Sequence, residues 1–335
     1  MTLDSPSTVP QRHEAHRDRC REGWRFRVFV LAALALVAAC GEGEEPEGDP
    51  TVPRAPDSSP VRRTVPGDYP SIQEALDDAR IGDTILVAPG VWSGPLEMPA
   101  APVILASTVL TGSDSSVVAG TVINGNGSDW VVHFDTLSGH SRILGLTLRN
   151  ATDCIRASGS FDFEGGILTD CGDGIAYEAG SGGHVAHSRI FENRDDGVEM
   201  SGDHIVLLEH NLIRGNGDDG IEIRFSGYDG AVKRTVIRDN LVRGNRGDGV
   251  RIIGHAEASN LAVLLERNRV VENQGTGISC RAPGSPSDDE ALAGAGAVLE
   301  EEIVFVENLL EANGAGLTCG YLSTRRPSTP ESPET

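Results

Sequence analysis

The sequence predicts an all-β solenoid on three grounds: an internal repeat, apolar segments of strand length, and turn residues that recur at fixed positions. Four segments share one pattern: "HSRIFENRDDGVEM" (187–200), "HNLIRGNGDDGIEI" (210–223), "DNLVRGNRGDGVRI" (239–252) and "RNRVVENQGTGISC" (267–280), with weaker copies at 164–177 and 307–319. Each unit holds alternating apolar segments that are too short for helices. Such short strands cannot bury their apolar side alone, so successive units must stack as parallel ladders.

Each element of the repeat has an expected role in that stack. Aliphatic residues after the repeat glycine point inward and form rows: Val198, Ile221, Val250 and Ile278. Asparagines recur at two positions of the unit and are expected to stack their amides inside the turns. The glycine column (Gly174, Gly197, Gly220, Gly249, Gly277) is expected to supply backbone angles that other residues resist.

This pattern resembles the right-handed parallel β-helix of the pectate-lyase-like superfamily over about residues 64–321. The resemblance implies a right-handed, single-stranded parallel β-helix. The opening "TVPGDYPSIQEALDDARIGDTILVAPGVW" (64–92) looks like the start of many such proteins. Within it, Ser71 and Glu74 form a capping-box pattern ahead of an apolar stripe, which predicts a short amphipathic helix covering the open end of the stack.

The N-terminal segment "RFRVFVLAALALVAAC" (25–40) has basic residues, an apolar run too short to span a membrane, and small residues before a cysteine. These features predict a signal peptide. The ending "VAAC" resembles the lipobox of bacterial lipoproteins, which implies that Cys40 is acylated and that the protein is exported to the cell envelope, at the outer membrane or cell surface. An ordinary signal peptide is the alternative. The expected organisation is a signal peptide (1–39), an acidic Pro-rich tether (40–63), the β-helix domain (64–321) and a disordered tail (322–335).

The net charge of the chain restricts the partners that it can bind. Without residues 1–39 the chain has 22 basic and 46 acidic residues, a net charge of −24 that disfavours nucleic acid and anionic polymers unless a cation mediates.

Cys280 and Cys319 each lie three residues after a repeat glycine, so stacking places them within disulfide range. Cys154 and Cys171 could pair similarly, although their registers differ. Metal-ligand spacing such as C-x-x-C is absent, so no zinc site is expected.

The recurring aspartates allow three interpretations. "GDDG" (217–220) and "RDDG" (194–197) look similar to the acid pair of polygalacturonases, which share this fold, and that resemblance makes Asp196 and Asp219 candidate acids. The further "GHG" and "RIK" motifs of that family are missing, although "IIGHA" (252–256) supplies His255. A calcium-binding stack at the Asp196 and Asp219 turns is the second interpretation. The third, which the recurrence favours, is a turn in which each carboxylate caps local backbone N–H groups.

The strand after each repeat glycine offers a second candidate face, because alternation points Glu199, Glu222, Arg224, Arg251, Ser279 and Arg281 outward. Insertions follow this strand at 225–233, 254–260 and 282–302 and could form the wall of a groove, with Phe225, Tyr228 and His255 available for sugar stacking or proton transfer. The alternative is a solvated, ion-paired face with tolerated insertions.

The favoured function is therefore a lipid-anchored envelope β-helix that binds polysaccharide or serves structurally, without catalysis. The alternative is a polysaccharide lyase, glycoside hydrolase or epimerase acting on acidic polysaccharide through the face at 195–255. Its candidate catalytic residues are Asp196, Asp219, Glu222, Arg251 and His255, and the candidate binding residues are Glu199, Arg224, Phe225 and Tyr228. The expected partners are the membrane, through the anchor, and a polysaccharide, but no nucleic acid.

Overall fold

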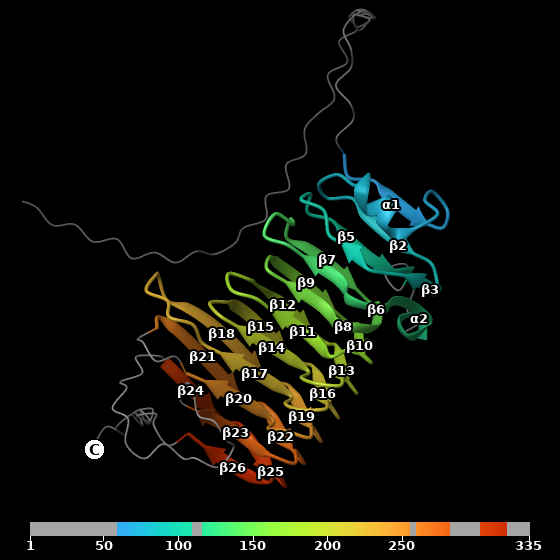
Figure 1. Cartoon of the computed structure of the whole chain (residues 1–335). Coiled ribbons are helices and arrows are strands. Elements are labelled where there is room, and N and C mark those ends of the chain that lie inside the picture. Colours follow the sequence, from blue (N-terminus) through green and yellow to red (C-terminus); the bar gives the residue numbers. More distant parts are fainter. Residues whose placement is uncertain (1–58, 109–115, 255–258, 282–301, 320–335) are drawn as a thin grey trace, which may run out of the picture. The chain divides into compact units, whose positions relative to one another are not determined.

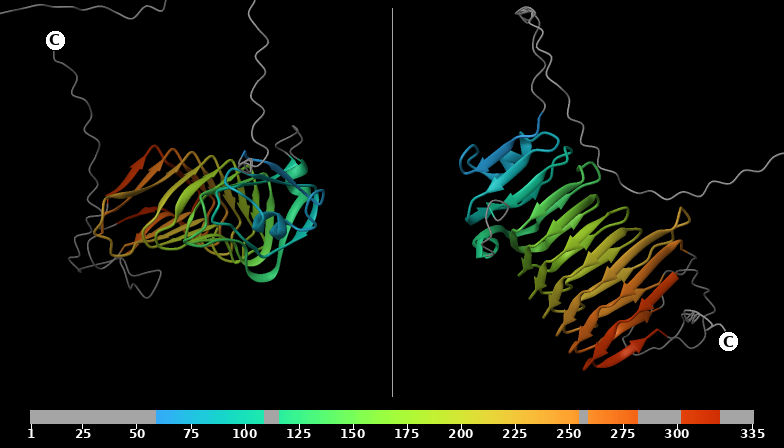
Figure 2. Two further views of the ribbon diagram at one scale, coloured as in Figure 1. Left: turned by 90° about the horizontal axis from the view of Figure 1, so that it is seen from above. Right: turned by 180° about the vertical axis from the view of Figure 1, so that it is seen from behind.

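The computed structural model describes residues 59–108, 116–254, 259–281 and 302–319. Over these residues the chain is a right-handed parallel β-helix, as predicted, in which strands of successive coils lie side by side in rows (Figures 1 and 2). The first sheet has the order β1-β2-β5-β7-β9-β12-β15-β18-β21-β24. Its strands are β1 (Arg62–Val65), β2 (Thr84–Val87), β5 (Ile104–Ser107), β7 (Ser141–Leu144), β9 (Ser160–Glu164), β12 (Gly182–Ala186), β15 (Ile205–Glu209), β18 (Lys233–Arg238), β21 (Leu261–Glu266) and β24 (Glu302–Val306).

The second sheet contains two rows of strands. One row is β10 (Ile167–Thr169), β13 (Arg189–Phe191), β16 (Leu212–Arg214), β19 (Leu241–Arg243), β22 (Arg269–Val271) and β25 (Leu309–Glu311). The other row is β11 (Asp173–Tyr177), β14 (Val198–Ser201), β17 (Ile221–Arg224), β20 (Val250–Ile253), β23 (Thr276–Arg281) and β26 (Ala315–Thr318). Both rows pair with the long strand β8 (Thr147–Ala157), which in turn pairs with β6 (Thr121–Phe134). Strand β6 also pairs with β3 (Gly90–Ser93) and β4 (Leu96–Glu97), and the short helix α2 (Ser116–Gly120) precedes it.

The predicted aliphatic row lies in the core. Val198 pairs with Ile221, Ile221 with Val250, and Val250 with Ile278, and all four side chains are buried. Two asparagine ladders run beside it, one through Asn211, Asn240, Asn268 and Asn308 and the other through Asn193, Asn216, Asn245, Asn273 and Asn313. In each step one Oδ1 accepts both the backbone N–H and the Nδ2 of the preceding asparagine. The buried turns are thereby hydrogen-bonded from coil to coil.

The repeat glycines are needed for space and not for an unusual backbone angle. A Cβ on Gly220 would lie 2.6 Å from the carbonyl oxygen of Gly249 and 2.7 Å from Nδ2 of Asn245. Positive φ angles fall elsewhere in the coil, for example at Glu192 (φ 55) and His210 (φ 55). The expectation that this column supplies special backbone angles is therefore wrong: the close approach of neighbouring coils excludes a side chain there.

The N-terminal end of the solenoid carries the expected helix, α1 (Ile72–Asp77) (Figure 1). Ser71 is its N-cap: Oγ accepts the backbone N–H of Glu74 at 3.2 Å and donates to the Glu74 carboxylate at 3.0 Å. Ile72, Ala75 and Leu76 are buried against the first strands. Apolar burial on one stripe of the helix and the cap together account for its position.

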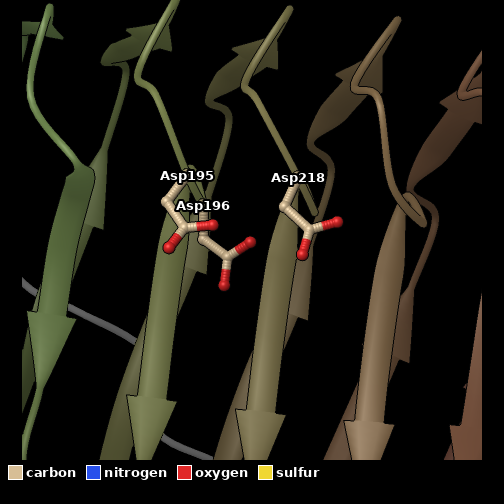
Figure 3. Close-up of side chains that lie close together, drawn as sticks. All are labelled: Asp195, Asp196 and Asp218. Carbon is tan, nitrogen blue, oxygen red and sulfur yellow. The ribbon is translucent and has the colours of Figure 1, made fainter. Parts of the chain in front are cut away.

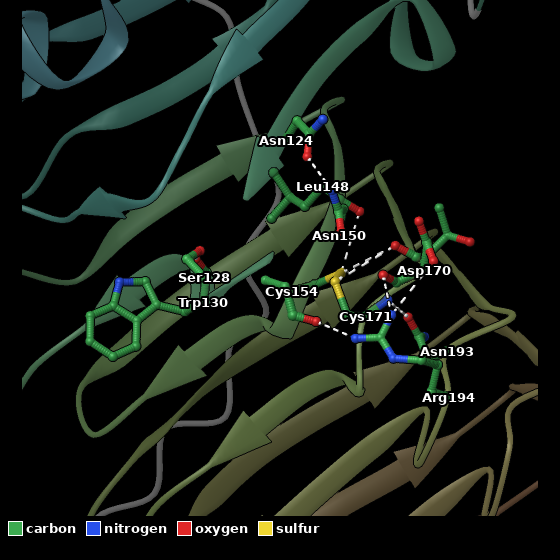
Figure 4. The surroundings of a disulfide bond; sticks show 12 residues. Asn124, Ser128, Trp130, Leu148, Asn150, Cys154, Asp170, Cys171, Asn193 and Arg194 are labelled. Carbon is green, nitrogen blue, oxygen red and sulfur yellow. Dashed lines mark hydrogen bonds and ion pairs between the residues drawn. A yellow bond between two sulfur atoms is a disulfide. The ribbon is translucent and has the colours of Figure 1, made fainter. Parts of the chain in front are cut away.

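Two disulfides join neighbouring coils. Cys154 in β8 is bonded to Cys171 with a Cα–Cα distance of 5.6 Å, and Cys280 in β23 is bonded to Cys319 with a Cα–Cα distance of 4.5 Å. Around the first bond, Arg194 donates to the carbonyl oxygens of Ala151 and Asp170 (Figure 4). Both pairings were expected from the sequence, Cys280–Cys319 from a shared register and Cys154–Cys171 despite registers that differ.

The predicted signal peptide, the acylation site Cys40, most of the tether and the C-terminal tail lie outside the described residues. No helix in the described part of the chain is long and apolar enough to cross a membrane.

Candidate carboxylate site

The recurring aspartates form a hydrogen-bonded column that runs from coil to coil. Oδ1 of Asp173 accepts the backbone N–H of Asp196 at 2.9 Å, and Oδ1 of Asp196 accepts that of Asp219 at 2.7 Å. The same bond links Asp219 to Asp248 at 2.5 Å and Asp248 to Thr276 at 2.6 Å. Each carboxyl group therefore caps a backbone N–H, as the turn interpretation expected, but the N–H belongs to the next coil and not to its own turn.

Burial raises the pKa values of the Asp196 and Asp219 carboxyl groups. Asp196 is 6% exposed and Asp219 is fully buried. Burial, reinforced by the charges of Asp219 and Glu222, raises the pKa of Asp196 to about 9. Burial also raises the pKa of Asp219 to about 8, although the charge of Arg251 acts in the opposite direction. Burial therefore disfavours the charged form of both groups.

Arg251 forms ion pairs with the carboxylates of the C-terminal part of the column. Its Nε lies 2.8 Å from Oδ2 of Asp219 and 3.4 Å from Oδ2 of Asp248, and its Nη1 lies 3.6 Å from Oε2 of Glu222. The Oδ2 of Asp219 nevertheless receives no aligned hydrogen bond. Asp248 gains a second arginine, Arg281, at 3.2 Å. In the described residues no such ion pair reaches Asp173 or Asp196, so the carboxyl groups of these two residues have no arginine or lysine partner there.

Glu222 differs from the expectation of a solvated outward face. It lies on the side of the sheet away from the core, yet its side chain is only about 1% exposed. Nε of Arg224 lies 2.5 Å from its Oε1, and Arg251 approaches its other oxygen. Arg251 reaches Glu222 across the strand spacing of about 4.8 Å, and Arg224 approaches it from two residues further along the same strand, so the long arginine side chains cover the shorter glutamate. Arg224 and Glu199 remain partly accessible, with a distance of 3.8 Å between Arg224 Nε and Glu199 Oε1.

Two groups of three carboxylates have oxygen atoms within 4.8 Å of one another: Asp195 with Asp196 and Asp218, and Asp196 with Asp219 and Glu222. Calcium binds oxygen at 2.3–2.6 Å, so two oxygens on one ion lie at most about 5 Å apart. The first group fits, because Asp195 is exposed and Asp218 is about half exposed, and the side chains of one turn and its neighbour lie together (Figure 3). The second group does not fit, because its residues are sealed from solvent and Arg251 already occupies its edge.

The remaining predicted site residues are not brought together at this site. Phe225 is buried in the hydrophobic core and presents no face to a sugar. Tyr228 is half-buried with Nζ of Lys233 lying 4.8 Å from the centre of its ring. His255 and residues 282–301 of the longest insertion lie outside the described residues, so the groove that the insertions were expected to form stays a prediction.

The structure adds residues that the sequence reasoning did not single out. Asp195 and Asp218 are the first acids of "RDDG" and "GDDG", and the doubled aspartate was the available signal. Trp130 occupies the position of the aspartate column in β6, because it pairs with Asp153, which pairs with Asp173. Arg156 pairs with Ala176, and Ala176 with Glu199, so it begins the outward row that leads to Glu222 and Arg251.

Comparison with known proteins gave a matching family model and several similar solved structures. Residues 137–263 match the family model described as a right handed beta helix region. Pectate lyase Pel9A is 14% identical, with a TM-score of 0.45 over 72% of this chain and 82% of that chain. An alginate lyase from Paenibacillus sp. str. FPU-7 is 16% identical, with a TM-score of 0.46 over 77% of this chain and 98% of that one. A pectin methylesterase from carrot is 13% identical, with a TM-score of 0.43 over 75% and 90%.

Comparison with curated proteins gave no match. The fold and the matched segment define the chain as a right-handed parallel β-helix protein.

Proposed function

We propose that the β-helix domain binds an acidic polysaccharide on the outward face of its second sheet, without catalysis, and that calcium held by Asp195, Asp196 and Asp218 joins the polymer to the protein. The observation that carries the proposal is the convergence of these three carboxylates within 4.8 Å, with Asp195 exposed and Asp218 about half exposed beside the buried Asp196. Arg224, half-exposed one coil further along, offers a direct contact for a carboxylate of the polymer.

The charge of the chain supports a role for a cation. A net charge of −22 repels a polyanion, and the repulsion is strongest at a corner that carries three acids. Calcium takes six to eight oxygen ligands, so three protein carboxylates leave positions for water and for oxygens of a polyuronate. The ion would thus convert a repulsive surface into a binding surface.

Burial favours binding over catalysis. A general acid or base must come within hydrogen-bond reach of the reacting atom. Asp219 and Glu222 are closed to solvent, and Arg251 and Arg224 already neutralise them. The raised pKa of Asp196 is the one observation that favours the alternative of a lyase, hydrolase or epimerase, because a carboxyl group that stays protonated can act as a proton donor.

The test is binding of polygalacturonate and alginate to the whole protein, measured by calorimetry in calcium and in chelator. We expect binding in calcium, loss of binding in chelator, and an affinity at least about tenfold lower for Asp195→Asn and Asp218→Asn, since each removes one charged ligand. Glu311→Gln is the matched control, because this exposed acid on β25 lies outside both carboxylate groups. Binding that ignores chelator and both variants would refute the calcium-dependent site.

The same mixtures of protein and polysaccharide decide between binding and catalysis. They are analysed for new reducing ends, for unsaturated sugars and, by NMR, for inverted C5 centres. We expect none of these products. Turnover that disappears in Asp196→Asn would replace the binding proposal with the enzymatic one.

The location proposed for this activity is the bacterial cell envelope, through an acyl chain on Cys40. The apolar run that ends in "VAAC" supports this assignment. Mass spectrometry of the mature N-terminal peptide is expected to show a lipid on Cys40. Cys40→Ser should release the protein from membranes whereas Cys20→Ser should not, and equal membrane recovery of both variants would contradict the anchor.

A further inference from the structure

Trp130 stands at the N-terminal end of the aspartate column, on the same face as the proposed calcium site. The pairing runs from Trp130 to Asp153 and from Asp153 to Asp173, and the next residue of the column is Asp196. Three strand spacings of about 4.8 Å place Trp130 about 14 Å from the Asp196 position along the solenoid axis. A ligand that extends along this face therefore meets an aromatic ring about 14 Å beyond the Asp196 position.

The surroundings of Trp130 are unusual for a structural tryptophan. The ring is half-buried, its centroid lies 4.5 Å from that of His133, and the guanidinium carbon of Arg156 lies 5.4 Å from its centre. The indole Nε1 is buried and has no hydrogen-bond acceptor in the described residues. An indole N–H can only donate, and a buried donor without an acceptor is costly. Trp92, in contrast, donates its Nε1 to the carbonyl oxygen of Ala88 at 2.9 Å.

The neighbouring charges suit an anionic sugar. Nε of Arg156 lies 2.6 Å from Oδ2 of Asp153, and the arginine side chain remains partly exposed beside the ring. Nδ1 of His133 lies 2.8 Å from Oε2 of the exposed Glu97. An aromatic ring with an arginine beside it offers an apolar surface for the C–H groups of a pyranose and a cation for its carboxylate.

We propose that Trp130, His133 and Arg156 form a second subsite that takes one uronate residue of the polysaccharide, and that tight binding requires an oligosaccharide long enough to reach both this subsite and the Asp195–Asp196–Asp218 corner. The inference rests on the proposed function of that corner. Because the two subsites are about 14 Å apart, a disaccharide occupies only one of them, whereas a hexasaccharide can occupy both.

The test measures the calcium-dependent affinity of the whole protein for oligogalacturonates from the dimer to the hexamer. Wild type is expected to bind the hexamer at least about tenfold more tightly than the dimer, which corresponds to about 1.4 kcal/mol. Trp130→Ala and Arg156→Gln should remove that gain, so that the hexamer binds only about as tightly as the dimer. Trp130→Phe retains a ring, so it should keep most of the gain and guards against a variant that fails only through packing.

Fluorescence gives a second readout that a purely structural tryptophan would not show. In a Trp92→Phe background with residues 1–39 removed by processing, the emission comes from Trp130 alone. Saturating hexamer should shift this emission and saturating dimer should not. Unchanged emission, or equal losses for dimer and hexamer in Trp130→Ala, would overturn the second subsite while calcium-dependent binding persists. Absence of any calcium-dependent binding would overturn both the proposed function and this inference.

Discussion

The carboxyl group of Asp196 accepts the backbone N–H of Asp219 at 2.7 Å, so a side chain of one coil is hydrogen-bonded to the main chain of the next. The same contact recurs from Asp173 to Thr276. The aspartates therefore link adjacent coils by hydrogen bonds, at a position just before each strand that contributes to the outward face. This arrangement explains their recurrence without catalysis and sets the pH behaviour of the domain.

Asp196→Asn is expected to stabilise the protein at pH 8, whereas Asp196→Ala should destabilise it. The asparagine keeps an oxygen acceptor for the Asp219 N–H, while alanine loses it at a cost of about 0.5–2 kcal/mol. The folded pKa of about 9 lies above the unfolded value, so the stability from this carboxyl group is complete below about pH 4 and is lost as the pH rises toward 9. Urea unfolding at pH 5 and pH 8, in chelator, measures both effects. Equal pH dependence in wild type and Asp196→Asn would contradict the assignment, and Asp229→Asn in an exposed loop is the control.

Arg251→Met should be strongly destabilising, by about 3–5 kcal/mol near pH 8, because it leaves buried carboxylates without their cation. The loss should be smaller at pH 5, because the raised pKa of Asp219, about 8, lets this buried carboxyl group take up a proton. Arg243→Met is the matched control: Arg243 pairs with Glu272 at 2.7 Å on the exposed surface, and such a pair contributes about 0–1 kcal/mol. Similar losses in the two variants would show that the Arg251 network is not energetically distinct.

The two disulfides should be reduced in a fixed order under native conditions. Cys154 and Cys171 are completely buried, whereas Cys319 is partly accessible in the last coil described. A thiol must reach the sulfur atom that it attacks, so Cys280–Cys319 should be reduced first. Timed treatment with dithiothreitol followed by alkylation and mass mapping checks the order. In urea, where both bonds are exposed, the difference should vanish; reduction of Cys154–Cys171 first in buffer would be inconsistent with its burial.

His204 should make the domain sensitive to acid. Its side chain is buried, Nδ1 lies 3.0 Å from Oγ1 of Thr235, and burial lowers its pKa to about 4. The nearby charges of Asp203 and Lys233 oppose each other. The unfolded imidazole takes up a proton near pH 6.5, so stability that is complete above that pH is lost by about 3 kcal/mol as the pH falls to 4. His204→Gln should flatten this limb of the stability profile, while His187→Gln at the surface should leave it unchanged.

The spacing of the repeat was enough to predict the stacked coils, because each unit is an incomplete structure that must bury its aliphatic residues against the next. Val198, Ile221, Val250 and Ile278 could be aligned by eye and pair as expected. Cys280 and Cys319 shared a register for the same reason, and the cap at Ser71 is a local pattern that depends on four consecutive residues. Features that depend on periodicity or on near neighbours in sequence were therefore readable from the chain.

Contacts between coils were not readable in the same way, and tertiary structure alone decided them. Trp130 joins the aspartate column only because β6 pairs with β8 through a shift of register between Asn124 and Ser128, which interrupts any alignment by period. Whether Glu222 meets solvent depends on the direction in which Arg224 and Arg251 extend from neighbouring positions, and alternation along one strand cannot supply that direction. Within the regular repeats, the sequence by itself determined which residues share a column. The approach of adjacent coils, at a spacing shorter than an arginine side chain, decided which of those residues are buried, protonated or left accessible to a ligand.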